Sequence, residues 1–159
     1  MKYLYVSVSA AVSFVLDQLT KSMILDRFRE GEMLAVIPGF FDLTLRFNRG
    51  AAFSLFDGKP STFFFILAAL AIGALLYFVA GLNARERGQL VALGAILGGA
   101  VGNLIDRIRM GAVTDFLVFH FRGLEWPAFN VADTVIVVGV VIFLWKNLQE
   151  AKTAPREEA

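Results

Sequence analysis

The sequence has no cysteine, and its single histidine is His120. Without cysteine the protein has no disulfide, no thiol nucleophile and no cysteine-ligated metal. One histidine rules out a multi-histidine metal site and leaves most serine–histidine relays hard to build. The sequence also lacks the His-Glu-x-x-His motif of zinc proteases and the Gly-x-Ser-x-Gly nucleophile elbow. Ser54 and Lys59 could in principle form a serine–lysine pair, but no apolar strand visibly holds the lysine against the serine. The chemistry that remains available to the polar residues of the spans is carboxylate chemistry.

Charge is scarce as well. Charged residues make up 18% of the 159 residues and hydrophobic residues 57%. Soluble domains have about 45–50% apolar and about 25% charged residues, so this composition indicates a membrane protein. The net charge of +1 gives no indication of nucleic-acid binding. The length fits one domain, which we place at residues 1–149, with a polar tail at 150–159 that we expect to be frayed helix or disorder.

Four apolar runs are long enough to form membrane-spanning helices. Thr62 to Gly81 is twenty residues without a charge, and as a helix it reaches about 30 Å, the thickness of a hydrocarbon core. Gly88 to Ile105 is rich in the small residues that let helices approach closely in lipid. The other two runs are Asn130 to Trp145 and Tyr3 to about Leu25. No small-x-small cleavage site follows the amino-terminal run, so we expect a retained helix and not a cleaved signal peptide.

The connections between these runs differ in length and pattern. The longest, from about Asp26 to Ser61, has turn residues at Pro38-Gly39 followed by alternating apolar and polar positions. This pattern predicts a short strand pair or small sheet lying on the membrane. Asn83 to Arg87 is a tight loop, and we expect the third connection, about Asp106 to Phe129, to be a loop that carries His120.

The basic residues alone do not decide the orientation in the membrane. Four helices place both termini on one side, where we count six lysines and arginines, against eight on the other side. Cytoplasmic loops normally carry the excess, so this count does not put the termini in the cytoplasm. The arginines of the loop side need another explanation, such as contact with lipid phosphates or with a substrate.

Two aspartates, Asp115 and Asp133, stand beside small and apolar residues at the membrane boundary. A carboxylate there is costly to desolvate, so it is by default a candidate functional group. Two close carboxylates in a weakly polar site would share a proton, which suggests an acid–base pair. Taken singly, each could instead be an N-cap or a salt-bridge partner.

Other polar residues of the spans gather near the same end of the helices. Because neighbouring spans run antiparallel, the end of the first, the start of the second, the end of the third and the start of the fourth meet at one membrane surface. Polar residues that are dispersed in sequence but converge in topology are what an active site looks like. The residues are Asp17 and Lys21, Asn103, Asp106 and Arg107, and Asn130 and Asp133.

Each group also has a plainer structural interpretation. Asp17 and Lys21, four residues apart on one helical face, form a structural ion pair in that interpretation. The polar residues at the end of the third span would anchor a helix end at the headgroups. Gly98-Gly99 would serve helix packing and not a substrate groove. Asn130 would cap the fourth span, and the segment from Asn48 to Phe53 would be an ordinary turn.

Four motifs occur in order along the chain. They are Asn48-Arg49-Gly50-Ala51-Ala52-Phe53-Ser54, Gly98-Gly99-Ala100-Val101-Gly102-Asn103-Leu104-Ile105-Asp106-Arg107, Gly111-x-Val113-x-Asp115-Phe116 and Phe129-Asn130-x-Ala132-Asp133. Together they resemble the lipoprotein signal peptidases of bacteria (type II signal peptidase). Asp17 and Lys21 also match the first-helix pattern of that family, and the resemblance covers the chain from about Tyr3 to Trp145.

The resemblance implies an intramembrane aspartyl endopeptidase of the bacterial cytoplasmic (inner) membrane. Its fold would be a bundle of four transmembrane helices with a small extracytoplasmic β-cradle and a short interfacial helix. Both termini would lie in the cytoplasm, which overrides the arginine count. The substrate would be a prolipoprotein that already carries a diacylglyceryl group, cut just before the lipidated cysteine, and the cyclic peptide globomycin would inhibit the reaction. The partners would be this substrate, membrane lipids and the inhibitor; we expect a monomer without metal, cofactor or nucleic acid.

The resemblance also implies roles for individual residues. Asp115 and Asp133 would form the catalytic dyad, in which the ionised carboxylate deprotonates a water and the protonated one donates to the scissile carbonyl oxygen. The asparagines would orient the substrate or the aspartates without adding charge. The supporting or substrate-binding set is Asp17, Lys21, Asn48, Gly50, Ala51, Asn103, Asp106, Arg107, Asn130 and Ala132.

Two other classes of function stay open on the sequence. A small transporter or channel would also carry converging carboxylates, although its polar positions would recur through the membrane thickness and here they gather at one end. A non-enzymatic membrane assembly factor would keep a partner interaction without peptidase activity.

Overall fold

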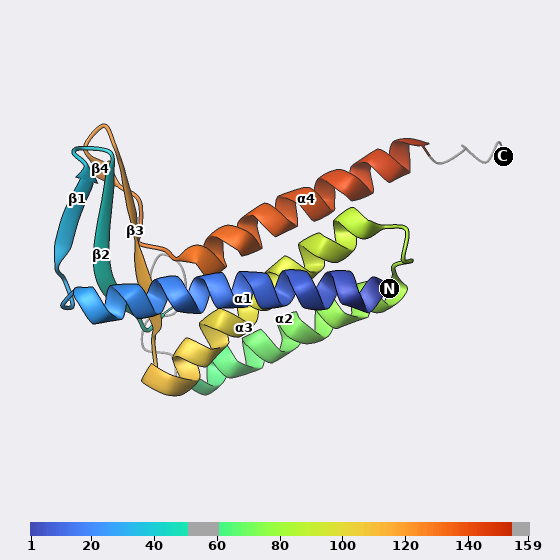
Figure 1. Cartoon of the computed structure of the whole chain (residues 1–159), viewed down its shortest axis with the longest axis horizontal. Helices are drawn as coiled ribbons and strands as arrows, with labels where there is room; N and C mark the ends of the chain where they lie inside the picture. Colours follow the sequence, from blue (N-terminus) through green and yellow to red (C-terminus); the bar gives the residue numbers. More distant parts are fainter. Residues whose placement is uncertain (51–60, 154–159) are drawn as a thin grey trace.

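A computed structural model describes residues 1–50 and 61–153, which form four long helices and one small sheet (Figure 1). The helices are α1 (Lys2–Arg27), α2 (Ser61–Gly81), α3 (Arg87–Met110) and α4 (Val131–Thr153). All four are long and apolar enough to cross a membrane, so the four predicted spans are confirmed.

α3 is longer than its apolar run. The sequence pattern ends the run at Ile105, but the helix continues through Asp106 and Arg107 to Met110. It ends at Gly111, whose positive φ of 70° breaks the helical repeat while its N–H donates to the Arg107 carbonyl oxygen at 3.0 Å. The charged last turn is therefore part of the helix and lies next to the sheet.

The sheet is antiparallel, with strand order β1-β2-β3-β4 (Figure 1). Its strands are β1 (Met33–Ile37), β2 (Phe41–Asn48), β3 (Val113–Phe121) and β4 (Leu124–Glu125). The predicted strand pair between the first two spans is confirmed as β1 and β2. The expectation of a loop around His120 was wrong, because residues 113–121 pair with β2 in a register that sets Leu43 opposite Leu117. No further short helix occurs within residues 1–50 and 61–153.

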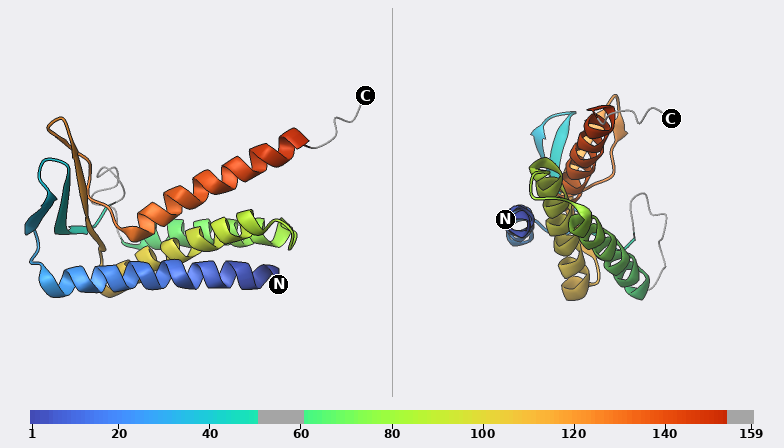
Figure 2. Two further views of the ribbon diagram at one scale, coloured as in Figure 1. Left: turned by 45° about the horizontal axis from the view of Figure 1, so that its top comes forward. Right: turned by 90° about the vertical axis from the view of Figure 1, so that its right-hand side faces the viewer.

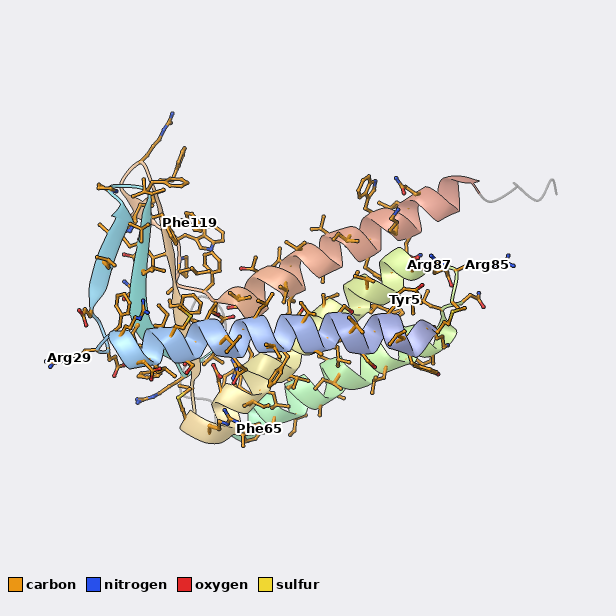
Figure 3. All side chains as sticks on the ribbon, viewed as in Figure 1. Tyr5, Arg29, Phe65, Arg85, Arg87 and Phe119 are labelled. Carbon is orange, nitrogen blue, oxygen red and sulfur yellow. The ribbon has the colours of Figure 1, made fainter. Side chains whose placement is uncertain are left out.

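The two ends of the bundle are formed by different elements. The start of α1, the α2–α3 loop and the end of α4 lie at one end, and the sheet lies at the other (Figure 1 and Figure 2). Figure 3 places Arg85 and Arg87 at the end of the termini and Arg29 at the sheet end. Lys2 joins the start of α1 to the end of α2, because its Nζ donates to the Ala80 carbonyl oxygen at 3.0 Å and to that of Leu82 at 3.1 Å.

α3 is the central helix and packs against the other three. Its glycines make the close approach to α1 possible. A Cβ at Gly98 would collide with the carbonyl oxygen of Ala10, and a Cβ at Gly94 would collide with Ser9. On the other side, a Cβ at Gly99 would lie 2.8 Å from the carbonyl oxygen of Ala132 in α4. The packing interpretation of Gly98-Gly99 is therefore confirmed.

This packing makes a testable prediction for the replacement Gly98→Ala. The added methyl group must push α1 away from α3, because its neighbour is backbone and cannot rotate aside. Overpacking of this kind costs about 1–3 kcal/mol, so the thermal unfolding midpoint in detergent micelles should fall by several degrees.

Gly73→Ala in α2 is the matched control. A Cβ on Gly73 has no neighbour within 4 Å among the described residues. Because alanine is a better helix former by about 1 kcal/mol, this change should leave the midpoint unchanged or raise it. Equal midpoints for the two variants would contradict the packing account.

Candidate active site

Asp115 and Asp133 come from different elements and line one cavity at the sheet end of the bundle. Asp115 is the third residue of β3, and Asp133 is the third residue of α4. The cavity has a volume of about 580 Å³, and Asn48, Asn103 and Arg107 line it with them. The convergence predicted from topology is therefore present in the structure.

The Asp115 carboxylate is buried, at 2% exposure, and both of its oxygens accept hydrogen bonds. Asn130 Nδ2 donates to Oδ1 at 2.7 Å, and Asn48 Nδ2 donates to Oδ2 at 2.9 Å. The β2–β3 register delivers Asn48 to this position, because it sets Asn48 opposite Val113, two residues before Asp115. Asn48 Oδ1 also accepts from the Gly50 N–H at 3.1 Å, which fits the start of the predicted turn, while residues 51–53 of that turn lie outside the described residues.

Asp133 belongs to the helix cap and to the cavity at the same time. Asn130 Oδ1 accepts from the Asp133 N–H at 2.9 Å, and Asp133 Oδ2 accepts from the Asn130 N–H at 3.2 Å. This reciprocal pair is a capping box at the start of α4. Asp133 Oδ1 accepts from Asn103 Nδ2 at 2.9 Å. The predicted cap at Asn130 is thus confirmed, and capping leaves Asp133 facing the cavity.

Asp115 titrates far from an ordinary aspartate. Burial, and then the negative charge of Asp133, raise the pKa of Asp115 from 3.8 to about 7, against the opposing effect of the hydrogen bonds from Asn48 and Asn130. Because the two carboxylates interact, the proton belongs to the pair. The pair therefore takes up a proton as the pH falls through about 7, which leaves one acid and one base in the same cavity.

A buried ionic group contacts the cavity-lining residue Asn103 through Lys21. We call it the Lys21 cluster: Asp17, Lys21 and Asp106. Lys21 Nζ lies 2.8 Å from Asp17 Oδ2 and 3.0 Å from Asp106 Oδ2. The predicted Asp17–Lys21 ion pair is confirmed and includes a third member. Asp106 is 3% exposed, so the interpretation of this residue as a headgroup anchor was wrong. The backbone N–H groups of Thr114 and Ala132 donate to the cluster, at 3.1 and 2.9 Å.

Arg107 closes another side of the cavity. Its guanidinium donates to the Asn103 carbonyl oxygen at 3.3 Å and to the Gly50 carbonyl oxygen at 3.4 Å. Its Cζ lies 5.1 Å from the centre of the Phe64 ring, within range of a cation–π contact. Arg107 therefore holds backbone carbonyls near the site, while Ala51, which was also predicted as a site residue, lies outside the described residues.

The apolar wall of the cavity was not predicted from the sequence. It includes Trp126 and Phe129 from the segment after β4, and Val137 and Val138 from α4. Phe129 is fixed to the sheet by its N–H, which donates to the Leu117 carbonyl oxygen at 3.0 Å. The dipeptide Trp126-Pro127 breaks the regular pattern of this connection, but a sequence pattern alone does not show which way its side chains point. Within residues 1–50 and 61–153, no group of three or more acidic, histidine or cysteine side chains is placed to hold a metal ion.

Comparison with known proteins identifies the family. A family model described as signal peptidase (SPase) II matches residues 9–149. The chain belongs to the signal peptidase II family. The lipoprotein signal peptidase of Azoarcus sp. is 46% identical over 151 residues, which are 93% of this chain and 85% of that protein. That of Symbiobacterium thermophilum is 44% identical over 147 residues, 91% of this chain and 95% of that protein.

Solved structures are similar over the same extent. Two structures described as bacterial membrane enzymes superpose on this chain with TM-scores of 0.85 and 0.79 and sequence identities of 33% and 35%. The alignments cover 96% and 89% of this chain, and 92% and 90% of the other chains. The family supports a peptidase of the membrane and the removal of a signal peptide from prolipoproteins, over the channel and assembly-factor alternatives.

The raised pKa of Asp115 makes a prediction that needs no substrate. Infrared spectra of the purified protein should contain a protonated carboxyl band that the Asp115→Asn/Asp133→Asn double variant lacks. Because the acid form is the protonated one, this band should disappear as the pH rises through about 7. A midpoint near 4, the value of an ordinary aspartate, would contradict the account of the site.

Proposed function

We propose that the protein is an intramembrane aspartyl endopeptidase that removes the signal peptide from diacylglyceryl-modified prolipoproteins, cutting before the lipidated cysteine. One observation carries the proposal: Asp115 and Asp133 line one cavity, and their interaction helps raise the pKa of Asp115 to about 7. A pair that keeps a single proton near neutral pH can supply both the base and the acid of a hydrolysis.

The mechanism uses a water placed between the two carboxylates. The ionised carboxylate takes a proton from this water as its oxygen bonds to the scissile carbonyl carbon. The protonated carboxylate gives its proton to the carbonyl oxygen, so the tetrahedral intermediate carries no full negative charge. As the intermediate collapses and the C–N bond breaks, one of its hydroxyl groups returns its proton to the ionised carboxylate. The protonated carboxylate gives its proton to the leaving amine of the cysteine residue, so the dyad again holds one proton. The reaction needs no covalent intermediate.

The asparagines support this chemistry as neutral donors. Asn48 and Asn130 hold the two oxygens of Asp115, and Asn103 holds one oxygen of Asp133. Because amides carry no charge, they fix the orientation of the carboxylates with a smaller effect on ionisation than a lysine or arginine at the same distance. The dyad can then stay oriented and still exchange its proton near neutral pH.

The substrate would occupy the cavity between β3 and the start of α4. The aromatic and aliphatic side chains of Trp126, Phe129 and Val137 suit a signal-peptide segment and an acyl chain, which are both apolar. We place the sheet and the dyad at the outer face of the bacterial inner membrane, with both termini in the cytoplasm. The enzyme would act as a monomer, with globomycin competing for the substrate cavity.

Replacement of either dyad residue tests the proposal. Asp115→Asn and Asp133→Asn should each abolish measurable cleavage of a lipid-modified precursor, a loss of at least about 10²-fold, because each variant lacks an acid or a base. Asp26→Asn, at an exposed position near the same end of α1, is the matched control and should keep full activity. Appreciable turnover by either dyad variant, in protein that is folded and inserted, would refute the dyad.

Lipid dependence is a separate prediction. The purified protein should cleave a diacylglyceryl-modified precursor and leave the unmodified precursor intact, because the acyl chains supply apolar surface that the cavity buries. Globomycin should block the cleavage. The released fragments are measured by mass spectrometry, and equal cleavage of both precursors would contradict the substrate assignment.

A further inference from the structure

The two backbone segments that lead into the dyad are held by the same buried cluster. The N–H of Thr114, the residue before Asp115, donates to Asp106 Oδ2 at 3.1 Å. The N–H of Ala132, the residue before Asp133, donates to Asp17 Oδ1 at 2.9 Å. Each dyad aspartate therefore follows a residue whose backbone N–H donates to a carboxylate of a different element, α3 for Asp115 and α1 for Asp133.

Lys21 joins these two anchors. Its Nζ lies 2.8 Å from Asp17 and 3.0 Å from Asp106, and all three side chains are buried, with Lys21 at 2% exposure. Without the ammonium group, the two carboxylates would repel each other in a medium of low dielectric. Lys21 thus completes a continuous path of ionic and hydrogen-bonded contacts from the backbone before Asp115 to the backbone before Asp133.

Lys21 also decides how Asn103 is oriented. Its Nζ donates to Asn103 Oδ1 at 2.9 Å. An ammonium group has donors and no acceptor, so the amide must present its oxygen to Lys21 and its NH₂ group to the other side. On that side Nδ2 donates to Asp133 Oδ1 at 2.9 Å. Asn130 Nδ2 also donates to Asn103 Oδ1, at the longer distance of 3.3 Å. If Lys21 were absent, the amide would therefore lose the shorter of the two contacts that keep its donor on Asp133.

Stability alone does not account for burying three charges here. Buried ionic groups often contribute no more to stability than well-packed apolar side chains of the same size. The surroundings are nevertheless adapted to the cluster. Gln18 Nε2 donates to Asp106 Oδ1 at 3.1 Å, and a Cβ at Gly102 would collide with Asp17 Oδ2, so glycine leaves room for the carboxylate.

We infer that Lys21 is a positioning residue for the dyad: it joins the two carboxylates that anchor Thr114 and Ala132, and it keeps the Asn103 amide donating to Asp133. This inference rests on the proposed function. Lys21 is not among the residues that line the cavity. It positions the dyad through Asn103 and through the backbone N–H groups of Thr114 and Ala132.

The first test is Lys21→Met in the full-length protein, with two readouts. The infrared titration of Asp115 should move upward, because a nearby positive charge favours the ionised carboxylate and lowers the pKa of Asp115. With the lipid-modified precursor, kcat should fall at least tenfold while KM stays within threefold. Failure of the wild-type protein to cleave would refute the proposed function, and the infrared titration would still test the inference.

A second variant covers the case in which Lys21→Met does not fold. Lys21→Met/Asp106→Asn keeps the net charge of the Lys21 cluster at −1, and the oxygen of the new amide can still accept from the Thr114 N–H. The Asp115 titration should then stay near that of the wild type, while kcat remains at least tenfold lower because Asn103 Oδ1 has lost its contact with the ammonium group. A folded double variant with wild-type kcat would overturn the inference.

Lys2→Met is the matched control on the same helix. Lys2 Nζ donates to the carbonyl oxygens of Ala80 and Leu82 at the opposite end of α1. Its loss should lower the thermal unfolding midpoint and leave kcat and the Asp115 titration unchanged. Two results would show that Lys21 has only a structural role and would overturn the inference: Lys21→Met protein that unfolds at lower temperature but keeps its kcat and its titration, or Lys2→Met protein that shows the same kinetic defect.

Discussion

The structure depends on the neutralisation of charge inside an apolar bundle. Lys21 from α1 lies between Asp17 of the same helix and Asp106 of α3, and these carboxylates in turn hold the first turn of α4 and the start of β3. Removal of Lys21 would leave two buried carboxylates without a counter-charge, which is far more costly than the loss of a surface pair. α1, α3, α4 and the sheet therefore meet in one arrangement, and the dyad lies where they meet.

The second constraint is that Asp115 and Asp133 must be fixed in orientation while only one of the two carboxylates is ionised. Asparagines supply this hold: Asn130 uses its oxygen to cap α4 and its NH₂ group to bind Asp115, so a single side chain couples the helix start to the strand. Cationic donors in their place would favour two ionised carboxylates and remove the acid. The raised pKa of Asp115 therefore results from burial and from the Asp133 charge, with amides contributing orientation and only a partial opposing effect.

Part of this could be predicted from the sequence for clear physical reasons. Long charge-free runs marked the helices, and antiparallel order brought Asp17, Asn103 and Asp133 to one end. β3 was missed because strand pairing is non-local: residues 113–121 become a strand by pairing with β2, about seventy residues earlier in the chain. The hydrogen bonds of Thr114 and Ala132 could not be predicted from the sequence either, because they use backbone N–H groups, which every residue except proline carries.

The central claim is that Asp115 and Asp133 activate water directly. A single turnover in H₂¹⁸O, with enzyme in excess over a lipid-modified precursor, tests it most directly, because it reports where the oxygen of the attacking water goes. The account predicts one ¹⁸O atom in the new carboxyl terminus of the released signal peptide and none in either aspartate. Label in the side chain of Asp115 or Asp133 would show a covalent acyl intermediate and would contradict the claim.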